Sequence, residues 1–261
     1  MSDDIRRRAK ELFAQHRSRE RFVPFAGGLA LPDLAAAYAV QESYVALRRA
    51  YEGSKVAGWK IGLTSQRMQA LLGIDSPIAG AILDSQVLDS GAAVARADYV
   101  HLGLETEIAV RLGRDLPAAG APYTRAAVAA SVEAVCAAIE LVDDRAADYA
   151  VTDIGSLVAD NSWNEGVVLG EFRSEWPDLG SVSARVLRDG EEIDRGTGAD
   201  VLGHPFEPLT WLANHLAARG QGLRAGDIVS TGSIATTRFP SVPEECRFVV
   251  DGIGDVTLMV R

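Results

Sequence analysis

The chain has 261 residues, of which 48% are hydrophobic and 24% are charged, which is enough apolar material for one large folded unit. Its formal net charge of −10 and isoelectric point near 4.9 argue against a nucleic acid or an anionic membrane as partner, because both require a basic surface. The start of the chain is charged and no stretch is apolar over the length of a membrane span, so we expect a cytoplasmic protein.

The first part of the chain is predicted to be a helical arm. Two segments have the apolar spacing of amphipathic helices: Asp3 to about Arg17, behind Ser2 as its cap, and Asp33 to about Tyr51. We therefore expect residues 1–55 to form an N-terminal helical arm and residues 56–261 a single compact core.

Lys60 lies in a predicted strand from Val56 to Thr64, which a short helix from Ser65 to Leu72 follows. The odd-numbered residues of this strand are apolar: Ala57, Trp59, Ile61 and Leu63. Lys60 therefore faces the other side, with Gly58 and Gly62 beside it. A lysine between two glycines indicates a place where another group approaches closely, although a solvated lysine on a half-buried strand fits the same pattern.

Two carboxylates share one face of the next long predicted strand, from His101 to Leu112. Glu105 and Glu107 are two residues apart, and alternation along a strand directs both side chains to the same side. Their small neighbours on that face leave room for a ligand. A solvated face of an antiparallel strand explains the pair equally well when it is taken alone.

Glu140 interrupts the apolar run from Ala137 to Val142, near the end of a helix predicted from Thr124 to about Ala138. A carboxylate there is costly to bury unless it is protonated, paired or bound to a metal. Three convergent carboxylates repel one another unless a cation holds them, and their hard oxygens suit Mg2+, Mn2+ or Ca2+ rather than zinc. Lys60 would offset the remaining negative charge, and burial would make its proton easier to give up.

The remainder of the chain is predicted to be rich in strands. The strands are expected at 166–170, in a hairpin turning at Asp189-Gly190, at 227–231 and in a C-terminal hairpin around Asp251-Gly252. One helix is expected from Phe206 to Arg219, ending at Gly220. These elements predict a single compact α+β unit.

Five motifs, in the same order, carry a resemblance to a known family: Gly58–Ser65, Glu105–Glu107, Ile139–Asp143, Asp160-Asn161 and Val201–Pro205. From residue 37 to its C-terminus the chain resembles the 2-keto-4-pentenoate hydratase and 4-oxalocrotonate decarboxylase group of the fumarylacetoacetate hydrolase superfamily. The resemblance implies a mixed β-sandwich-like roll with flanking helices and a homo-oligomer. It also implies Mg2+ or Mn2+ held by Glu105, Glu107 and Glu140, with Lys60 as the acid/base group.

Other segments favour different branches of this group. Pro77–Gly80 resembles the decarboxylases, whereas Gly80–Asp84 and Gly232-Ser233 are similar to the hydratases. Trp163 and Glu165 depart from the small residues usual after Asp160-Asn161, which bears on the far end of the substrate.

Two further residues are candidates for the site. Ser233 could meet a substrate carboxylate or be an ordinary turn residue. Asp84 could be a partner of Lys60 or a surface residue at a strand end.

The leading functional hypothesis is a hydratase that adds water to a 2-hydroxy-2,4-dienoate and yields a 4-hydroxy-2-oxo acid. The alternative is a decarboxylase of a 2-oxo-3-enedioate.

A third hypothesis, hydrolytic cleavage of an acylpyruvate, generally needs a general base, for which the candidates are His16, His101, His204 and His215. His101 lies four residues from Glu105, about 13 Å along a strand, too far to reach the same metal. A non-catalytic, metal-stabilised binding protein would keep the three acids and tolerate loss of Lys60.

Overall fold

The computed structural model describes residues 3–27 and 30–261. Within these residues the strands form a seven-stranded mixed sheet in the order β2-β1-β10-β5-β6-β7-β3 and a five-stranded sheet in the order β4-β12-β11-β8-β9. The larger sheet contains β1 (Val56–Gly62), β2 (Ile78–Leu83), β3 (Val87–Asp89), β5 (Leu102–Leu112), β6 (Val132–Asp143), β7 (Asn164–Leu169) and β10 (Ile228–Ser233). The smaller sheet contains β4 (Ala92–Val94), β8 (Ser183–Arg188), β9 (Glu191–Thr197), β11 (Glu244–Val250) and β12 (Gly254–Val260).

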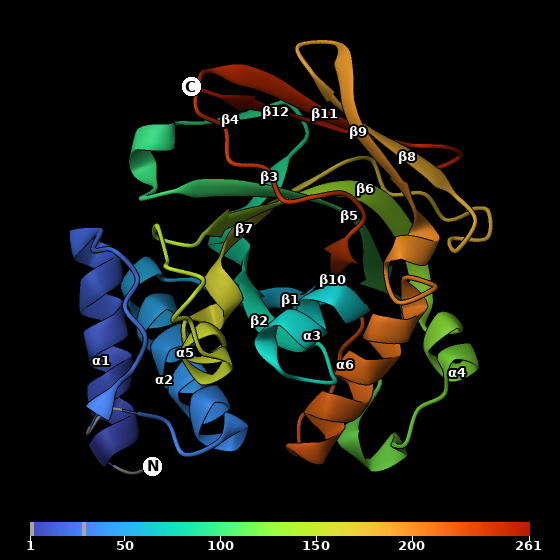
Figure 1. The fold of residues 1–261 in the computed structure, drawn as a ribbon. Helices are drawn as coiled ribbons and strands as arrows, with labels where there is room; N and C mark the ends of the chain where they lie inside the picture. Colours follow the sequence, from blue (N-terminus) through green and yellow to red (C-terminus); the bar gives the residue numbers. More distant parts are fainter. Residues whose placement is uncertain (1–2, 28–29) are drawn as a thin grey trace.

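The smaller sheet packs over β6 and β7 of the larger one, and helices flank the pair (Figure 1). The helices are α1 (Asp3–Ser18), α2 (Leu34–Glu52), α3 (Gln66–Leu72), α4 (Arg125–Ala129), α5 (Ile154–Ala159) and α6 (Phe206–Ala218). Helices α1, α2 and α5 lie together on one side of the molecule, and α4 packs against α6 on the other (Figure 1). This arrangement confirms the predicted α+β fold, a mixed sandwich-like roll with flanking helices.

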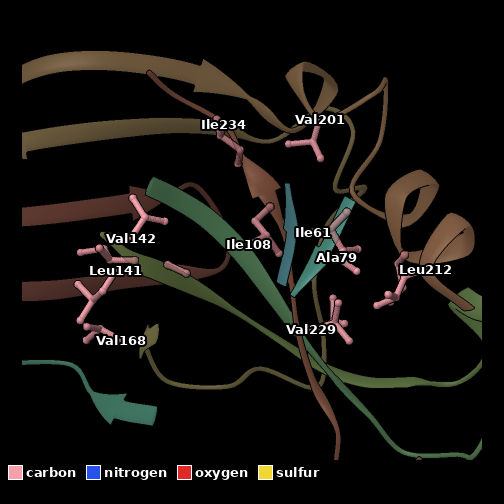
Figure 2. Packing of buried hydrophobic residues seen from close by; sticks show 14 of the residues in the cluster. Ile61, Ala79, Ile108, Leu141, Val142, Val168, Val201, Leu212, Val229 and Ile234 are labelled. Atoms are coloured by element: carbon pink, nitrogen blue, oxygen red, sulfur yellow. The ribbon is translucent and has the colours of Figure 1, made fainter. Parts of the chain in front are cut away.

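The main core lies along the middle strands of the larger sheet. Figure 2 shows Ile61, Ile108 and Val229, from β1, β5 and β10, in one cluster of buried residues with Leu212 of α6. Strands β5 and β6 are buried along nearly their whole length, and strands β11 and β12 of the second sheet pack against β6. A polar group on these strands is therefore removed from water, which sets the conditions for the site described below.

The helix predicted from Thr124 to about Ala138 is wrong in its second half. The Thr124 side chain does accept a hydrogen bond from the Ala127 N–H, as an N-cap does, but α4 ends at Ala129 and β6 begins at Val132. Strand β6 hydrogen-bonds to β5 on one side and to β7 on the other. These ladders outweigh the helix preference of the alanines in the segment.

The other predicted elements agree with the structure to within a few residues. The hairpins turn at Asp189-Gly190 and Asp251-Gly252, where both glycines have positive φ, and α6 ends one residue before Arg219. Ser2, the expected cap of α1, lies outside the described residues. Helix α5 and the short strands β3 and β4 were not anticipated. Among the described residues, no helix combines the length and apolar character needed to cross a membrane.

Candidate metal centre

Three glutamates converge where β5 pairs with β6. The antiparallel register sets Glu105 opposite Glu140, and the two-residue spacing along β5 places Glu107 on the same face. One carboxylate oxygen of each lies within 4.8 Å of the others. Glu107 and Glu140 are fully buried and Glu105 is partly buried, so the three do not form a solvated strand face.

Strand β10 and the loop that follows it hold the two β5 carboxylates in place. Glu107 Oε2 accepts hydrogen bonds from Ser230 Oγ at 2.5 Å and from the Gly232 N–H at 2.7 Å, both on β10. Glu105 Oε1 accepts a hydrogen bond from Thr237 Oγ1 at 2.8 Å. The orientation of each carboxylate is therefore set by the surrounding fold.

Glu140 is held by a side-chain amide and by the lysine. Its Oε1 accepts a hydrogen bond from Asn164 Nδ2 at 2.9 Å and lies 3.2 Å from Lys60 Nζ. The fold therefore places Lys60 beside the carboxylate cluster, where its positive charge offsets part of the negative charge, as expected.

Two buried oxygens of the cluster have no hydrogen-bond partner among the described residues. They are Glu107 Oε1 and Glu140 Oε2, and both are buried. Buried carboxylate oxygens are costly to leave unpaired, and hard oxygen atoms are the ligands that Mg2+ and related cations prefer. Glu105, Glu107 and Glu140 thus have the donor set and the free acceptors that fit a divalent metal ion.

The charges of the cluster disturb one another strongly. Burial raises the pKa of Glu140 to about 7 against the opposing effect of Lys60, and burial together with Glu140 and Glu105 raises the pKa of Glu107 well above its usual value. Burial alone would lower the pKa of Lys60, but the three glutamates outweigh it and raise that pKa. In this cluster Lys60 therefore holds its proton more tightly than usual, and the expectation that burial makes the proton easier to give up is wrong.

The glycines beside Lys60 mark close approaches. A Cβ on Gly58 would lie 1.8 Å from the Ile228 carbonyl oxygen of β10, and one on Gly62 would lie 3.4 Å from Lys60 Nζ. Lys60 is itself 4% exposed. It is not a solvated strand residue, and its glycine neighbours let the adjoining strand and the ammonium group fit.

A pocket of about 120 Å³ opens beside the cluster. Lys60 and Glu105 line it, and so do Ser162 and Trp163 from the turn that follows Asp160. Residues 161–163 all have left-handed backbone conformations, with φ between 52° and 59°. This uncommon backbone turns Ser162 and Trp163 toward the pocket, whereas Glu165 forms an ion pair with Arg48 outside it.

The two other predicted site residues, Ser233 and Asp84, do not line the pocket. Ser233 pairs with Glu107 across β10 and β5, but its hydroxyl donates to the Ala235 carbonyl at 2.8 Å and does not line the pocket. Asp84 lies beyond the far end of β2, where it accepts a hydrogen bond from the Lys55 N–H at 3.1 Å. Of the two readings of Asp84, the exposed residue at a strand end is the one that agrees with the structure. It does not contact Lys60, because β1 and β2 pair Lys60 with Gly80, four residues away from Asp84.

No histidine among the described residues lines the pocket. His16 contacts Asp160, and His101 lies beside Asp144 with Nδ1 2.8 Å from Oδ1. His204 directly precedes α6 and His215 lies within it, and neither lines the pocket. The hydrolytic hypothesis, which generally needs a general base, therefore finds no histidine in the lining of this pocket.

Several side chains that contact the cluster were not predicted from the sequence. Ser230, Thr237 and Asn164 hydrogen-bond directly to the three glutamates. A signal for Ser230 was present in the hydroxyl-rich segment that also contains Ser233. Thr237 and Asn164 had no such signal, since only the folded chain brings the loop after β10 and the start of β7 to the site.

Comparisons with known proteins agree on one family. Residues 63–261 match the family model described as fumarylacetoacetate (FAA) hydrolase C-terminal. A 2-keto-4-pentenoate hydratase of Burkholderia vietnamiensis is 34% identical over 260 residues, with 98% of each chain covered. A 4-oxalocrotonate decarboxylase of Pseudomonas putida is 32% identical over 85% of this chain and 83% of its own.

A solved structure is similar over the full length. It is 4-oxalocrotonate decarboxylase from Pseudomonas putida G7, complexed with magnesium and adipate, at 27% identity and a TM-score of 0.93, covering 100% of this chain and 99% of that one.

Proposed function

The chain belongs to the fumarylacetoacetate hydrolase C-terminal family, and from this membership we propose that it is a divalent-metal-dependent hydratase. Its substrate would be a 2-hydroxy-2,4-dienoate, the dienol form of a 2-oxopent-4-enoate-like acid, and its product a 4-hydroxy-2-oxo acid. Similar full-length relatives named as hydratases support this reaction type.

The observation that carries the proposal is the carboxylate cluster with its two unpartnered buried oxygens. We propose that Glu105, Glu107 and Glu140 hold Mg2+ or Mn2+. When bound, the ion would supply Lewis-acid polarisation of the 2-oxygen of the substrate. The similar decarboxylase whose structure contains magnesium supports a divalent ion, and the choice between the two metals belongs to this proposal.

Lys60 is the proposed acid/base group. Its ammonium is buried beside Glu140 and lines the pocket, so it can give a proton to a carbon of the bound dienol and later accept one from the water that adds at C4. Neutralising the three carboxylates would remove the effect that raises its pKa and leave burial, which lowers it. The apolar side chains of the pocket would exclude bulk water from this exchange.

The test is direct incubation of the purified protein with Mg2+ and 2-hydroxypenta-2,4-dienoate. We expect loss of the dienol absorbance and a product heavier by one water in the mass spectrum. A chelator should abolish the reaction, and readdition of Mg2+ or Mn2+ should restore it. No change in absorbance with either metal would rule out the hydratase.

Decarboxylation of a 2-oxo-3-enedioate is the second candidate. It is favoured by the similar decarboxylase sequence and by the structure of 4-oxalocrotonate decarboxylase, which was solved with a dicarboxylate, adipate. The same electron-withdrawing site would serve both reactions. Loss of carbon dioxide instead of gain of water, identified by product mass, would favour this candidate.

We further propose that the protein is a cytoplasmic homo-oligomer. Four large apolar side chains are exposed on two loops next to the pocket: Tyr149, Val151, Phe239 and Val242. Tyr149 and Phe239 line the same pocket, so the two loops are neighbours, and exposed apolar patches are typical of interaction surfaces. Light scattering that gives the mass of a single chain would contradict the oligomer.

A further inference from the structure

Apolar and aromatic side chains form much of the pocket wall beyond Lys60 and Glu105. Met68, Ile78, Leu157 and Trp163 are among the side chains that line it. Trp163 is held edge-on between Phe22, at 5.3 Å between ring centroids, and Tyr149, at 5.7 Å. Such a wall favours an uncharged substrate tail.

The volume of the pocket limits the length of that tail. At about 120 Å³ it is smaller than the cavity of about 150 Å³ that holds one benzene molecule in an engineered protein. The packed tryptophan cannot turn aside without losing its contacts with both aromatic neighbours. A short tail of a few carbons fits, and a bulky one does not.

The charges at the pocket are unfavourable for a second carboxylate. Among the described residues that line it, Lys60 is the single cation, and it lies 3.2 Å from Glu140. The other charged lining residues are acids, Glu105 and Asp144. A terminal carboxylate would therefore enter without a cation to pair with and would meet an acid.

Asp144 is fixed in this position. It is 1% exposed, and its oxygens accept hydrogen bonds from Tyr149 Oη at 2.8 Å and the Ala146 N–H at 2.9 Å. His101 Nδ1 lies 2.8 Å from Oδ1, and the ring stacks on Phe239 with 4.3 Å between centroids. The tyrosine hydroxyl and the imidazole nitrogen are thus already engaged by Asp144 and do not offer a substrate carboxylate a free donor.

We infer that Asp144 is a specificity-determining residue, which makes the pocket reject 2-hydroxydienoates with a terminal carboxylate and accept short ones with an uncharged tail. This inference rests on the proposed function for the identity of the reacting end of the substrate. It assigns to Asp144 a role in selection, not in proton transfer.

The first test compares two substrates on the wild type. With Mg2+ present, kcat/KM should be at least about tenfold higher for 2-hydroxypenta-2,4-dienoate than for 2-hydroxyhexa-2,4-dienedioate. Equal or better turnover of the dicarboxylate would overturn the inference and leave the proposed metal-dependent chemistry standing. Absence of turnover with both compounds would instead remove the proposed function.

A binding measurement separates selection from catalysis. Calorimetry with Mg2+ should show that 2-oxopentanoate binds about tenfold or more tightly than 2-oxohexanedioate, since only the latter carries a second carboxylate. Equal affinities would overturn the inference even if every dienoate proved inert.

Variants test Asp144 itself. Asp144→Asn should reduce the preference for the monocarboxylate by about tenfold, because it removes the charge with little change of shape. Tyr149→Phe should act in the opposite direction, since it removes a donor that partly offsets that charge. Asp148→Asn is the matched control, as it removes an exposed acid of the same loop that does not line the pocket.

A folded Asp144→Asn protein with the wild-type preference would overturn the assignment. If that variant does not fold, the direction of change in Tyr149→Phe decides it, and an unchanged or reduced preference would contradict the inference.

Discussion

At the scale of single residues, the cluster combines groups that repel one another with a fold that keeps them together. Glu107 and Glu140 are fully buried and each retains one oxygen without a partner. A divalent cation would relieve both the repulsion and the unmet hydrogen bonding. Metal binding should therefore be visible in the stability of the protein.

We predict that Mg2+ at a hundredfold excess over its dissociation constant stabilises the wild type by about 2.7 kcal/mol, measured by chemical unfolding with and without chelator. Glu140→Gln should lose most of this metal-dependent gain. Glu133→Gln is the matched control on the same strand, because Glu133 is exposed and pairs with Arg111. Equal metal-dependent gains in both variants would contradict the assignment of Glu140.

Lys60 gives the second prediction at this scale. Lys60→Met should lower kcat by at least about a hundredfold while metal binding, measured by calorimetry, persists, because a proton-transfer group acts in the chemical step. Lys55→Met is the control, since Lys55 is exposed just before the same strand. Wild-type turnover by the Lys60 variant would favour a role in charge balance alone.

At the scale of elements, α1 is attached to the core by a buried charge network. His16 contacts Asp160 and Glu165, and Arg145 contacts the other oxygen of Asp160. Asp160 directly precedes the left-handed turn at residues 161–163 whose side chains line the pocket. Helix α1 therefore contacts the residue that precedes one wall of the pocket and helps to hold that wall in place.

This network predicts a pH dependence of stability. Burial alone would lower the pKa of His16, but Asp160 and then Glu165 outweigh it and raise that pKa to about 9. Since the folded value exceeds the unfolded one, the stabilisation is complete below about pH 6.5 and is lost as the pH rises through about 9.

We expect the free energy of unfolding to fall by on the order of 2 kcal/mol over that interval, measured in urea at a series of pH values. His16→Gln should flatten the curve in this window. His204→Gln is a control, since His204 contacts Asp178 outside the network. A wild-type slope in the His16 variant would show that another group titrates there.

At the scale of the whole molecule, the helical arm is joined closely to the larger sheet. Gln41 of α2 donates hydrogen bonds to the carbonyls of Ala79 at 2.8 Å and Val158 at 2.7 Å. Tyr44 of the same helix is buried in a cluster with Leu83 of β2. The division into an arm of residues 1–55 and a core of residues 56–261 stays a prediction.

We predict that a chain restricted to residues 56–261 does not fold as stably as the whole. Its loss of α2 would expose apolar residues of β2 and α5 and remove the Gln41 hydrogen bonds to the Ala79 and Val158 carbonyls. Thermal unfolding followed by circular dichroism should show a broad transition at lower temperature, or aggregation. A sharp transition at the full-length temperature would make the core an independent domain.

The sequence by itself determined the ingredients of the site and most of the elements. Alternation placed Glu105 and Glu107 on one face, the interrupted apolar run singled out Glu140, and the two glycines singled out Lys60, because these are local patterns of residue type and spacing. The same local reasoning located both hairpins and α6.

Only the tertiary structure decided which distant side chains complete the site. Pairing on both sides made a strand of β6, where local preference had indicated a helix, and the register with β5 set Glu105 opposite Glu140. The register of β1 with β2 left Asp84 away from Lys60, and the pairing of β6 with β7 brought Asn164 to the cluster. Strand register and the packing of loops depend on contacts between residues far apart in the chain, and a local pattern does not contain them.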